Sequence, residues 1–216
     1  DPLHYHIYHI VLLCFCQFSS LWSVMPFFQT TAAAGTGSVL PDKYRMTSMI
    51  LADGTMGQMM EPVSLNYGEQ KKYDKSWAVT GTQMKREHNI INSLSLVPEE
   101  LEKFNFARYE KYAKVEKNEV MYETYMTDDA EICIVAFGIA ARVAKKAVVE
   151  ARKMGIKAGL FRPITLWPFP KKQLDALADK VNAFVSVELS MGQMVEDIEL
   201  SIHSKKPVHL VNSAGG

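Results

Sequence analysis

The chain has 216 residues, and its 24 Lys and Arg residues balance 24 Asp and Glu residues, so the formal net charge is zero. This balance argues against a general nucleic-acid binder, which needs a basic surplus to displace counterions. A hydrophobic content of 48% with 22% charged residues is typical of a folded globular protein and excludes a disordered chain. Three cysteines are too few, and too irregularly spaced, for a disulfide scaffold or an iron–sulfur cluster.

Residues 1–41 differ in composition from the rest of the chain. Asp1 is the only charged residue before Asp42. The stretch Ile10–Phe28 has the length of a membrane span, but polar residues interrupt it and no Lys or Arg precedes it. We therefore interpret residues 1–41 as an atypical segment, and a membrane-anchored protein is the weakest of three hypotheses.

His4, His6 and His9 raise the question of a metal site in the same segment. No Asp, Glu or Cys stands at a convincing spacing to complete a set of ligands. We expect a polar, extended segment here and predict no metal site.

Residues 42–128 show weaker patterns. Met49–Ala52 is predicted as a short strand that ends in a turn, and Gly57 as the start of a helix that Pro62 cuts short. An extended connector follows. Pro98 then opens a helical pattern that we extend to residue 125, with acids in its first turn and i,i+4 ion pairs along its solvated face.

From residue 129 onward the sequence alternates between apolar runs and amphipathic segments. This order predicts a parallel sheet with right-handed crossovers, so residues 129–216 form an α/β domain. The predicted strands span residues 131–137, 157–164, 183–189 and 208–211, and the predicted helices span 139–154, 168–180 and 192–203.

A Gly-Gln-Met-x-Glu motif occurs twice, at residues 57–61 and 192–196, each time after a predicted strand. The amides at such a helix N-terminus bind anions, which makes Gly192, Gln193 and Met194 candidate cofactor-binding residues. The structural alternative is tight strand-to-helix packing with an acid near the helix dipole, and the chemistry alone favours it.

Arg162 ends the second strand of the predicted sheet, on the rim where open α/β sheets bind ligands. It is therefore a candidate for binding an anionic cofactor, although Glu188, at the end of the third strand, could simply pair with it. Trp167 and the Pro-Phe-Pro run at 168–170 favour, by a small margin, an apolar patch for another domain. No complete catalytic motif is present, and we assign no catalytic residue and no metal ligand.

Four segments resemble one family, the alpha subunit of 2-oxoacid:ferredoxin oxidoreductases, and within it the branched-chain (3-methyl-2-oxobutanoate, or 2-oxoisovalerate) type. The likeness runs from about Asp42 to about Val208 and leaves residues 1–41 outside it. The segments are ILADGTMGQMMEPV (50–63), HNIINSL (88–94), FRPITLWPFP (161–170) and SVELSMGQMVEDI (186–198).

The resemblance implies a transketolase-C-terminal-like α/β domain at residues 129–216. Before it lie a connector with a helix at 66–128 and, at 42–65, the end of a pyrimidine-binding thiamine diphosphate domain. The implied reaction is the oxidative decarboxylation of a 2-oxoacid to an acyl-CoA, with electrons passed to ferredoxin, in the cytoplasm.

Thiamine diphosphate and Mg would be held mainly by a partner subunit, CoA would be a co-substrate, and iron–sulfur clusters would lie on other subunits. The implied partners are the beta, gamma and delta subunits and ferredoxin, with no nucleic acid and no membrane. The chain alone would then be inactive. The alternative is a non-catalytic α/β module kept for subunit contacts.

Overall fold

The computed structural model describes residues 40–52, 54–58, 60, 73–92 and 94–214. The three N-terminal histidines and the charge-free stretch 10–28 lie outside the described residues. The predicted domain boundary at residue 65 also lies outside them. Among the helices that are described, none is long and apolar enough to cross a membrane.

A five-stranded sheet forms the centre of the fold, in the order β1-β3-β2-β4-β5. β3, β2, β4 and β5 run parallel to their neighbours, and β1 pairs antiparallel with β3 at one edge. The strands are β1 (Tyr122–Tyr125), β2 (Ile132–Ala136), β3 (Ala158–Pro163), β4 (Ala183–Glu188) and β5 (Val208–Asn212).

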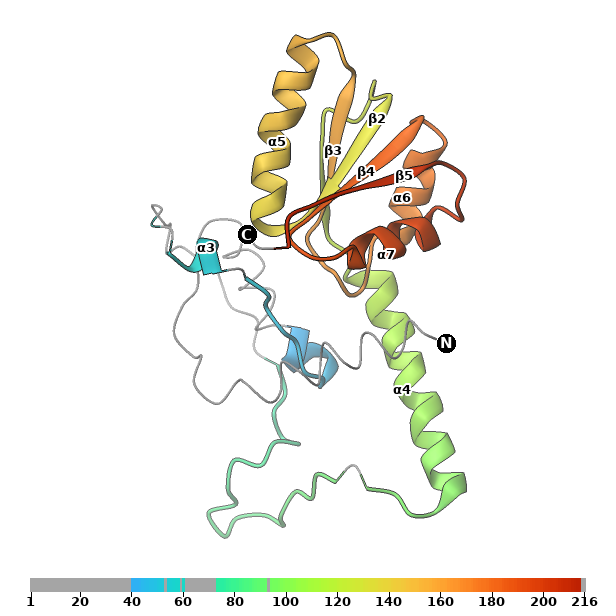
Figure 1. Ribbon diagram of the computed structural model, residues 1–216. Helices are drawn as coiled ribbons and strands as arrows, with labels where there is room; N and C mark the ends of the chain where they lie inside the picture. Colours follow the sequence, from blue (N-terminus) through green and yellow to red (C-terminus); the bar gives the residue numbers. More distant parts are fainter. Residues whose placement is uncertain (1–39, 53, 59, 61–72, 93, 215–216) are drawn as a thin grey trace.

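Helices cover both faces of this sheet (Figure 1). Helix α5 (Gly138–Lys153) lies on one face, and α6 (Lys171–Ala178) and α7 (Gln193–Ser201) lie together on the other. Each face has its own apolar core, one built around α5 with Leu160 and the other around α6 and α7 with Phe161 and Phe184. The predicted α/β fold with a mostly parallel sheet is confirmed.

Strand β1 was not expected from the sequence, which predicted helix through residue 125. Its residues are largely exposed, because an edge strand of this kind needs backbone partners more than apolar side chains. Backbone pairing with β3 supplies them, from Tyr122 opposite Pro163 to Tyr125 opposite Leu160. The Tyr122 ring also stacks on Phe161, with ring centroids 5.2 Å apart.

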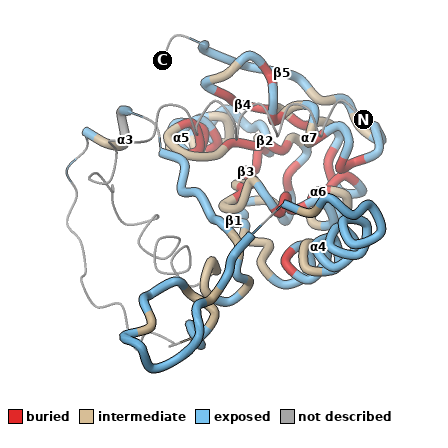
Figure 2. The backbone as a smooth tube through the Cα atoms, turned by 90° about the horizontal axis from the view of Figure 1, so that it is seen from below, coloured by how far each residue is buried: buried red, intermediate tan, exposed pale blue. Residues whose placement is uncertain are grey.

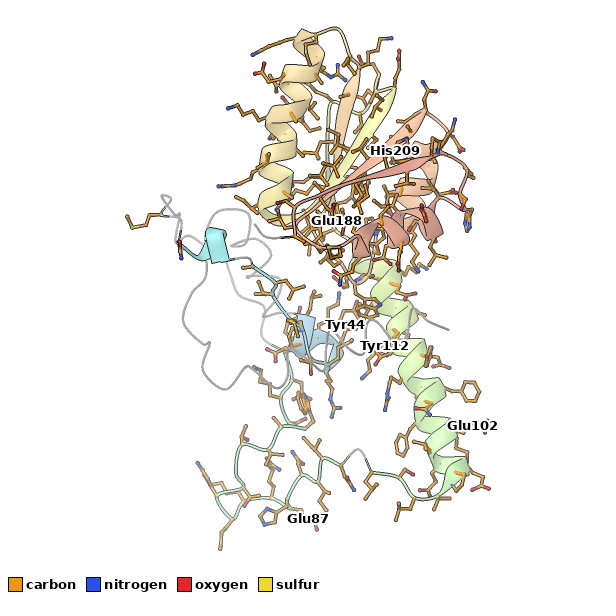
Figure 3. The ribbon with its side chains drawn as sticks, in the orientation of Figure 1. Tyr44, Glu87, Glu102, Tyr112, Glu188 and His209 are labelled. Atoms are coloured by element: carbon orange, nitrogen blue, oxygen red, sulfur yellow. The ribbon has the colours of Figure 1, made fainter. Side chains whose placement is uncertain are left out.

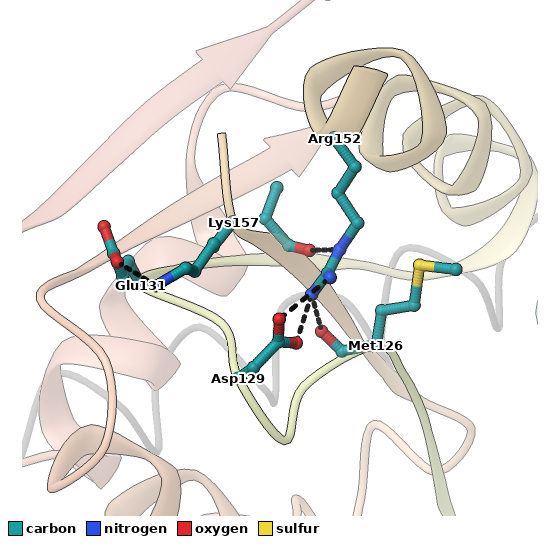
Figure 4. A network of polar contacts seen from close by, with 6 residues as sticks. Met126, Asp129, Glu131, Arg152 and Lys157 are labelled. Carbon is teal, nitrogen blue, oxygen red and sulfur yellow. Dashed lines mark hydrogen bonds and ion pairs between the residues drawn. The ribbon is translucent and has the colours of Figure 1, made fainter. Parts of the chain in front are cut away.

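Arg152, near the end of α5, joins three parts of the domain (Figure 4). Its guanidinium donates to both carboxylate oxygens of Asp129, at 3.1 and 2.7 Å, and to the carbonyl oxygens of Met126 and Ala158, at 2.8 and 2.7 Å. The bonds from Arg152 hold the pKa of Asp129 below its ordinary value. The same loop lies so close to Gly159 that a Cβ there would sit 2.6 Å from the Met126 carbonyl oxygen.

Helix α4 (Pro98–Asn118) begins at the predicted proline, with Glu99 and Glu100 in its first turn. It extends away from the sheet (Figure 1), and the burial colouring shows it mostly exposed (Figure 2). Val115 is its one buried residue. The predicted i,i+4 ion pairs are wrong, since no ion pair joins two α4 side chains in this fully described helix.

The predicted strand at residues 49–52 is also wrong, because this stretch is irregular and exposed in the structure. A strand needs a neighbour, and none of the five described strands lies beside it. The following helix, α3 (Gly54–Gln58), begins three residues before the predicted start at Gly57.

A short helix at residues 40–44 ties the early part of the chain to the end of α4. Lys43 Nζ and Tyr44 Oη both donate to Glu119 Oε1, each at 2.6 Å. Burial opposes ionisation of Glu119, but these two bonds outweigh it and leave the pKa of Glu119 below its ordinary value.

Candidate functional site

The candidate site is the rim where the parallel strands reach their carboxyl ends. Arg162 lies near the end of β3, Glu188 ends β4 and Asn212 ends β5. The loop from β4 to α7 crosses this rim, and Asn212 Nδ2 donates to the Ser190 carbonyl oxygen at 2.9 Å to hold the loop against β5.

Glu188 is the buried charged residue of the rim, with 2% of its surface exposed. Figure 3 shows it beside the start of α7, far from Glu87 and Glu102. Its carboxylate accepts four hydrogen bonds: from Ser186 Oγ (2.7 Å) and Val195 N (2.9 Å) at Oε1, and from Ser190 Oγ (2.7 Å) and Met194 N (3.0 Å) at Oε2. Helix α7 has no side-chain cap from its own N-cap residue, so Glu188 takes this role from the preceding strand.

Gly192 makes this turn possible. Its φ of 106° lies in the region that favours glycine, and a Cβ there would sit 2.9 Å from Leu210 Cδ2. Gly192 and Met194 are buried, whereas Gln193 is exposed. The amides of Met194 and Val195 thus already bind a carboxylate of the chain itself, as the packing interpretation of the motif expects; cofactor binding by residues 192–194 stays a prediction.

The structure does not bring Arg162 and Glu188 together. Arg162 Nη1 donates instead to Glu123 Oε2 at 2.8 Å, and the two residues are cross-strand partners in the β1–β3 register. Arg162 shares the α5 face of β3 with Leu160, while Glu188 shares the α6–α7 face of β4 with Phe184. The suggested Arg162–Glu188 pair is therefore wrong, because the sheet separates the two side chains.

The loop after β3 is less exposed than the predicted apolar patch requires. Pro168, Phe169 and Pro170 are all buried inside the domain. Trp167 is 43% exposed, and its ring meets the edge of Tyr112 from α4 at a centroid distance of 5.5 Å. The Pro-Phe-Pro part of the patch prediction is wrong, because that run fills the core of the domain, whereas Trp167 stays partly exposed and contacts α4.

Two further reactive side chains, Cys133 and Asp197, are buried to different extents. Cys133 has no exposed surface, and burial raises the pKa of its thiol to about 12. Burial also raises the pKa of Asp197 on α7, against the opposing charge of Lys171. No group of three or more His, Cys, Asp or Glu side chains lies together in the part of the chain described.

Comparison with known proteins decides the family. Residues 130–216 match the family described as pyruvate:ferredoxin oxidoreductase core domain II. The ketoisovalerate oxidoreductase subunit VorB of Methanothermobacter marburgensis is 51% identical over 178 residues, which cover 82% of this chain and 50% of that protein. The chain belongs to the 2-oxoacid:ferredoxin oxidoreductase family.

Other members of the family match less of the chain. The 2-oxoglutarate synthase subunit KorA of M. marburgensis is 32% identical over 90 residues, 42% of this chain and 24% of that protein. A solved 2-oxoglutarate:ferredoxin oxidoreductase from Magnetococcus marinus gives a TM-score of 0.48 at 21% identity, over 55% of this chain and 21% of the other. The chain spans about half the length of the curated VorB relatives it matches.

Two residues of this oxidoreductase family member matter more than sequence reasoning indicated. The sequence suggests Glu188 only as a partner for Arg162, and it predicts Glu123 within a helix. The sequence around Glu188 did hold a signal for this role. Ser190 follows two residues later and the Gly192 turn comes next, so a hydroxyl and helix amides lie within hydrogen-bonding reach of the carboxylate. Glu123 carried no such signal, since its role depends on an edge strand that lacks an apolar pattern.

Proposed function

We propose that the chain is part of the alpha subunit of a thiamine diphosphate-dependent 2-oxoacid:ferredoxin oxidoreductase. The complete enzyme converts a 2-oxoacid, CoA and oxidised ferredoxin to an acyl-CoA, CO2 and reduced ferredoxin, in the cytoplasm. The 51% identity to a ketoisovalerate oxidoreductase subunit over 178 residues carries this proposal and favours a branched-chain 2-oxoacid as substrate.

The N-terminus of α7 already binds the Glu188 carboxylate, and among the described residues no group of three or more His, Cys, Asp or Glu side chains lies together. Following the family resemblance, we propose that thiamine diphosphate and Mg are held mainly by a partner subunit, that iron–sulfur clusters lie on other subunits, and that CoA is a co-substrate. The beta, gamma and delta subunits and ferredoxin are the proposed partners.

The candidate cofactor-binding residues differ in how far their side chains are exposed. Gln193 is exposed at the start of α7, and Arg162 lines a surface pocket, so these two side chains are the candidates for direct contact. Gly192 and Met194 would act by setting the path of the turn. For the domains we propose residues 42–65 as the end of the pyrimidine-binding domain, 66–128 as the connector and 129–216 as the transketolase-C-terminal-like domain.

Exposed apolar side chains support a role among partners. They follow the connector and the first half of α4, where a groove of about 550 Å³ is lined almost entirely by apolar surface. Patches of this kind mark places where another protein surface packs. The exposed residues are Ile90, Ile91, Leu94, Leu96, Phe104, Phe106 and Tyr109.

A chimeric subunit tests the proposed function. The 178-residue stretch of M. marburgensis VorB that matches this chain is replaced by the corresponding residues of the chain, and the subunit is expressed with its native partners. We expect the complex to assemble and to reduce ferredoxin with 2-oxoisovalerate and CoA, because half of the exchanged residues are already identical.

The matched control exchanges the corresponding stretch of KorA from the same organism, which is 32% identical to this chain over 90 residues. Assembly and turnover with the present chain but not with the KorA stretch support the proposal. Loss of assembly with both, or turnover restricted to 2-oxoglutarate, would overturn it.

A further inference from the structure

The loop that follows β3, residues 164–168, is attached to the segment that joins α4 to β1. Both backbone polar groups of Met121 take part in this attachment. Its carbonyl oxygen accepts from Ile164 N at 3.0 Å and from Thr165 N at 3.1 Å, and its amide donates to Thr165 Oγ1 at 3.0 Å. The residue before β1 is therefore held by a loop from a distant part of the sequence.

The Thr165 hydroxyl has a further partner on the far side of the loop. It lies 2.8 Å from the Pro168 carbonyl oxygen and 3.3 Å from that of Met121, and its single hydrogen serves the shorter contact better. The hydroxyl thus accepts from Met121 N and donates to Pro168 O. One side chain thereby holds the joint of α4 and also the turn before Pro168.

The same loop also meets the side of α4. The rings of Trp167 and Tyr112 lie 5.5 Å apart at 78°, the edge-to-face arrangement that aromatic pairs prefer. None of the residues 98–114 is buried, and Val115 is the one buried residue of the helix. Since α4 ends at Asn118, loop 164–168 contacts the chain both before and after the end of the helix.

The other tie at the end of α4 does not reach the sheet. Glu119 accepts from Lys43 and Tyr44, and neither of these residues belongs to a strand of the sheet or to its apolar cores. Glu119 is thus tied to the early part of the chain and Met121 to the sheet domain, with Val120 between them. Because α4 extends from this point away from the sheet (Figure 1), a small change at Met121 changes the direction of the whole helix.

We propose that the Thr165 side chain couples the orientation of α4 to the conformation of loop 164–168. In the attached state, which is the one seen here, the hydroxyl binds Met121 N. In a released state water takes the place of the hydroxyl and α4 turns about Val120.

This coupling links two surfaces of the molecule. The loop lies at the carboxyl ends of the parallel strands, where open α/β sheets bind ligands, and α4 offers its exposed first half to a partner. Coupling between two sites acts in both directions, so a ligand at the rim and a partner on α4 would shift the same equilibrium. The proposal does not rest on the proposed reaction, because it concerns this chain alone.

The test is hydrogen exchange of the full chain, read by mass spectrometry, for the wild type, Thr165→Val and Thr165→Ser. Valine keeps the shape of threonine but removes the hydroxyl, so exchange in residues 111–118 should become about tenfold faster while β2 to β5 keep their rates. Serine keeps the hydroxyl and should leave the rates within about twofold of the wild type.

Two further variants supply the control and the reverse direction. Thr124 is exposed on β1, so Thr124→Val should change exchange in residues 111–118 by less than about twofold. Tyr112→Ala removes the contact with Trp167 from the side of α4. Exchange of the amides at residues 164–167 should then become about threefold faster, although the substitution lies in the helix.

Urea titration followed by circular dichroism verifies that each variant folds. Wild-type exchange in Thr165→Val, a serine variant or a Thr124→Val control that behaves like it, or faster exchange that is equal in α4 and in β2 to β5 would each overturn the proposal. Unchanged exchange at residues 164–167 in Tyr112→Ala would do the same. If Thr165→Val does not fold, Tyr112→Ala decides alone, because Tyr112 is only partly buried.

Discussion

At the scale of single residues, Glu188 shows how a buried charge can organise a turn. Its carboxylate joins two hydroxyl groups and two helix amides, from β4, the following loop and α7. Removing a buried acceptor leaves each of its donors without a partner. Glu188 therefore fixes the first turn of α7 against the end of β4, in addition to the apolar packing of the helix.

Glu188→Ala should lower the free energy of unfolding by about 2–4 kcal/mol, because several buried donors lose their acceptor. Urea titration followed by circular dichroism measures the change. The matched control is Glu131→Gln, whose exposed ion pair with Lys157 should leave the urea midpoint almost unchanged. Equal midpoints for the two variants would contradict the role given to Glu188.

Cys133 yields a second residue-scale prediction. Burial raises the pKa of its thiol to about 12, so in the folded protein it is both protonated and shielded. In a Cys14→Ser/Cys16→Ser background, a disulfide reagent at pH 8 should label Cys133 only after urea unfolds the domain. Rapid, complete labelling of the native variant would show that this part of the core opens readily.

Residue roles proved harder to predict than residue positions. The sequence predicts Arg162 and Glu188 near the ends of two strands that are consecutive in the chain, and the structure confirms both positions. The sequence does not indicate on which face of the sheet each side chain lies. These buried strands carry apolar residues on both faces, so their sequences show no alternation of apolar and polar residues. The observed pair of Arg162 and Glu123 also needed β1, which has no apolar pattern of its own.

At the scale of elements, the Arg152 network fixes the end of α5 to the β1–β2 loop and to β3. Hydrogen bonds from Arg152 lower the pKa of Asp129 in the folded state relative to its ordinary value of 3.8. A carboxyl whose pKa is lower when folded contributes stability above its unfolded pKa, and this stability is lost as the pH falls through the folded value.

Asp129→Asn should therefore lower the urea midpoint at pH 7, and its effect should shrink as the pH falls below 3.8, because the wild-type carboxyl then takes up a proton. Urea titrations of both proteins across this range provide the measurement. The urea midpoints of the two proteins should converge as the pH falls. A difference in midpoint that stays constant or grows would rule out the charged pair as its source.

Helix α4 should show a gradient of stability along its length. Its end is held by buried Val115 and by the contact between Tyr112 and Trp167, whereas Phe104 and Phe106 are 62% and 66% exposed. The unsupported part of α4 is short, and an isolated helical stretch below about 12–15 residues is marginal in water. Hydrogen exchange read by mass spectrometry should be fast at residues 98–108 and slower at 111–118, and uniform protection along α4 would contradict this.

Helices and strands were predicted correctly from the sequence where each apolar segment packs against another segment of the same chain. The strands and helices after residue 129 alternate because each buries its apolar side against the next. The stretch 49–52 has the apolar composition of a strand, yet it stays irregular because no strand of the described chain pairs with it. Helix α4 was found from Pro98 and its acids, which are local signals.

At the scale of the whole molecule, the packed part and the extended part of the chain are separate. The buried residues of both apolar cores lie in the sheet domain, between Ala130 and Ile202, and none of the described residues between 73 and 97 belongs to either core. The burial view shows the same division: the described residues between 73 and 97 are mostly exposed, and none of them is buried (Figure 2).

Brief digestion with trypsin should therefore cut first within the connector, at the exposed Lys85 and Arg86. Mass spectrometry should then find a resistant fragment that contains β1 through β5. A resistant fragment that retains residues 73–97, or loss of the sheet at the same rate as the connector, would show that the connector is packed more firmly than the structure indicates.

We propose that this chain supplies part of a 2-oxoacid:ferredoxin oxidoreductase subunit and works only within that assembly. The most direct test is the rate of ferredoxin reduction with 2-oxoisovalerate and CoA, measured for the isolated chain and for the VorB complex that carries it in place of the matching stretch. We predict no turnover by the isolated chain and clear turnover by the complex. Turnover by the chain alone, or an unchanged rate in a complex from which the stretch has been deleted, would contradict the account.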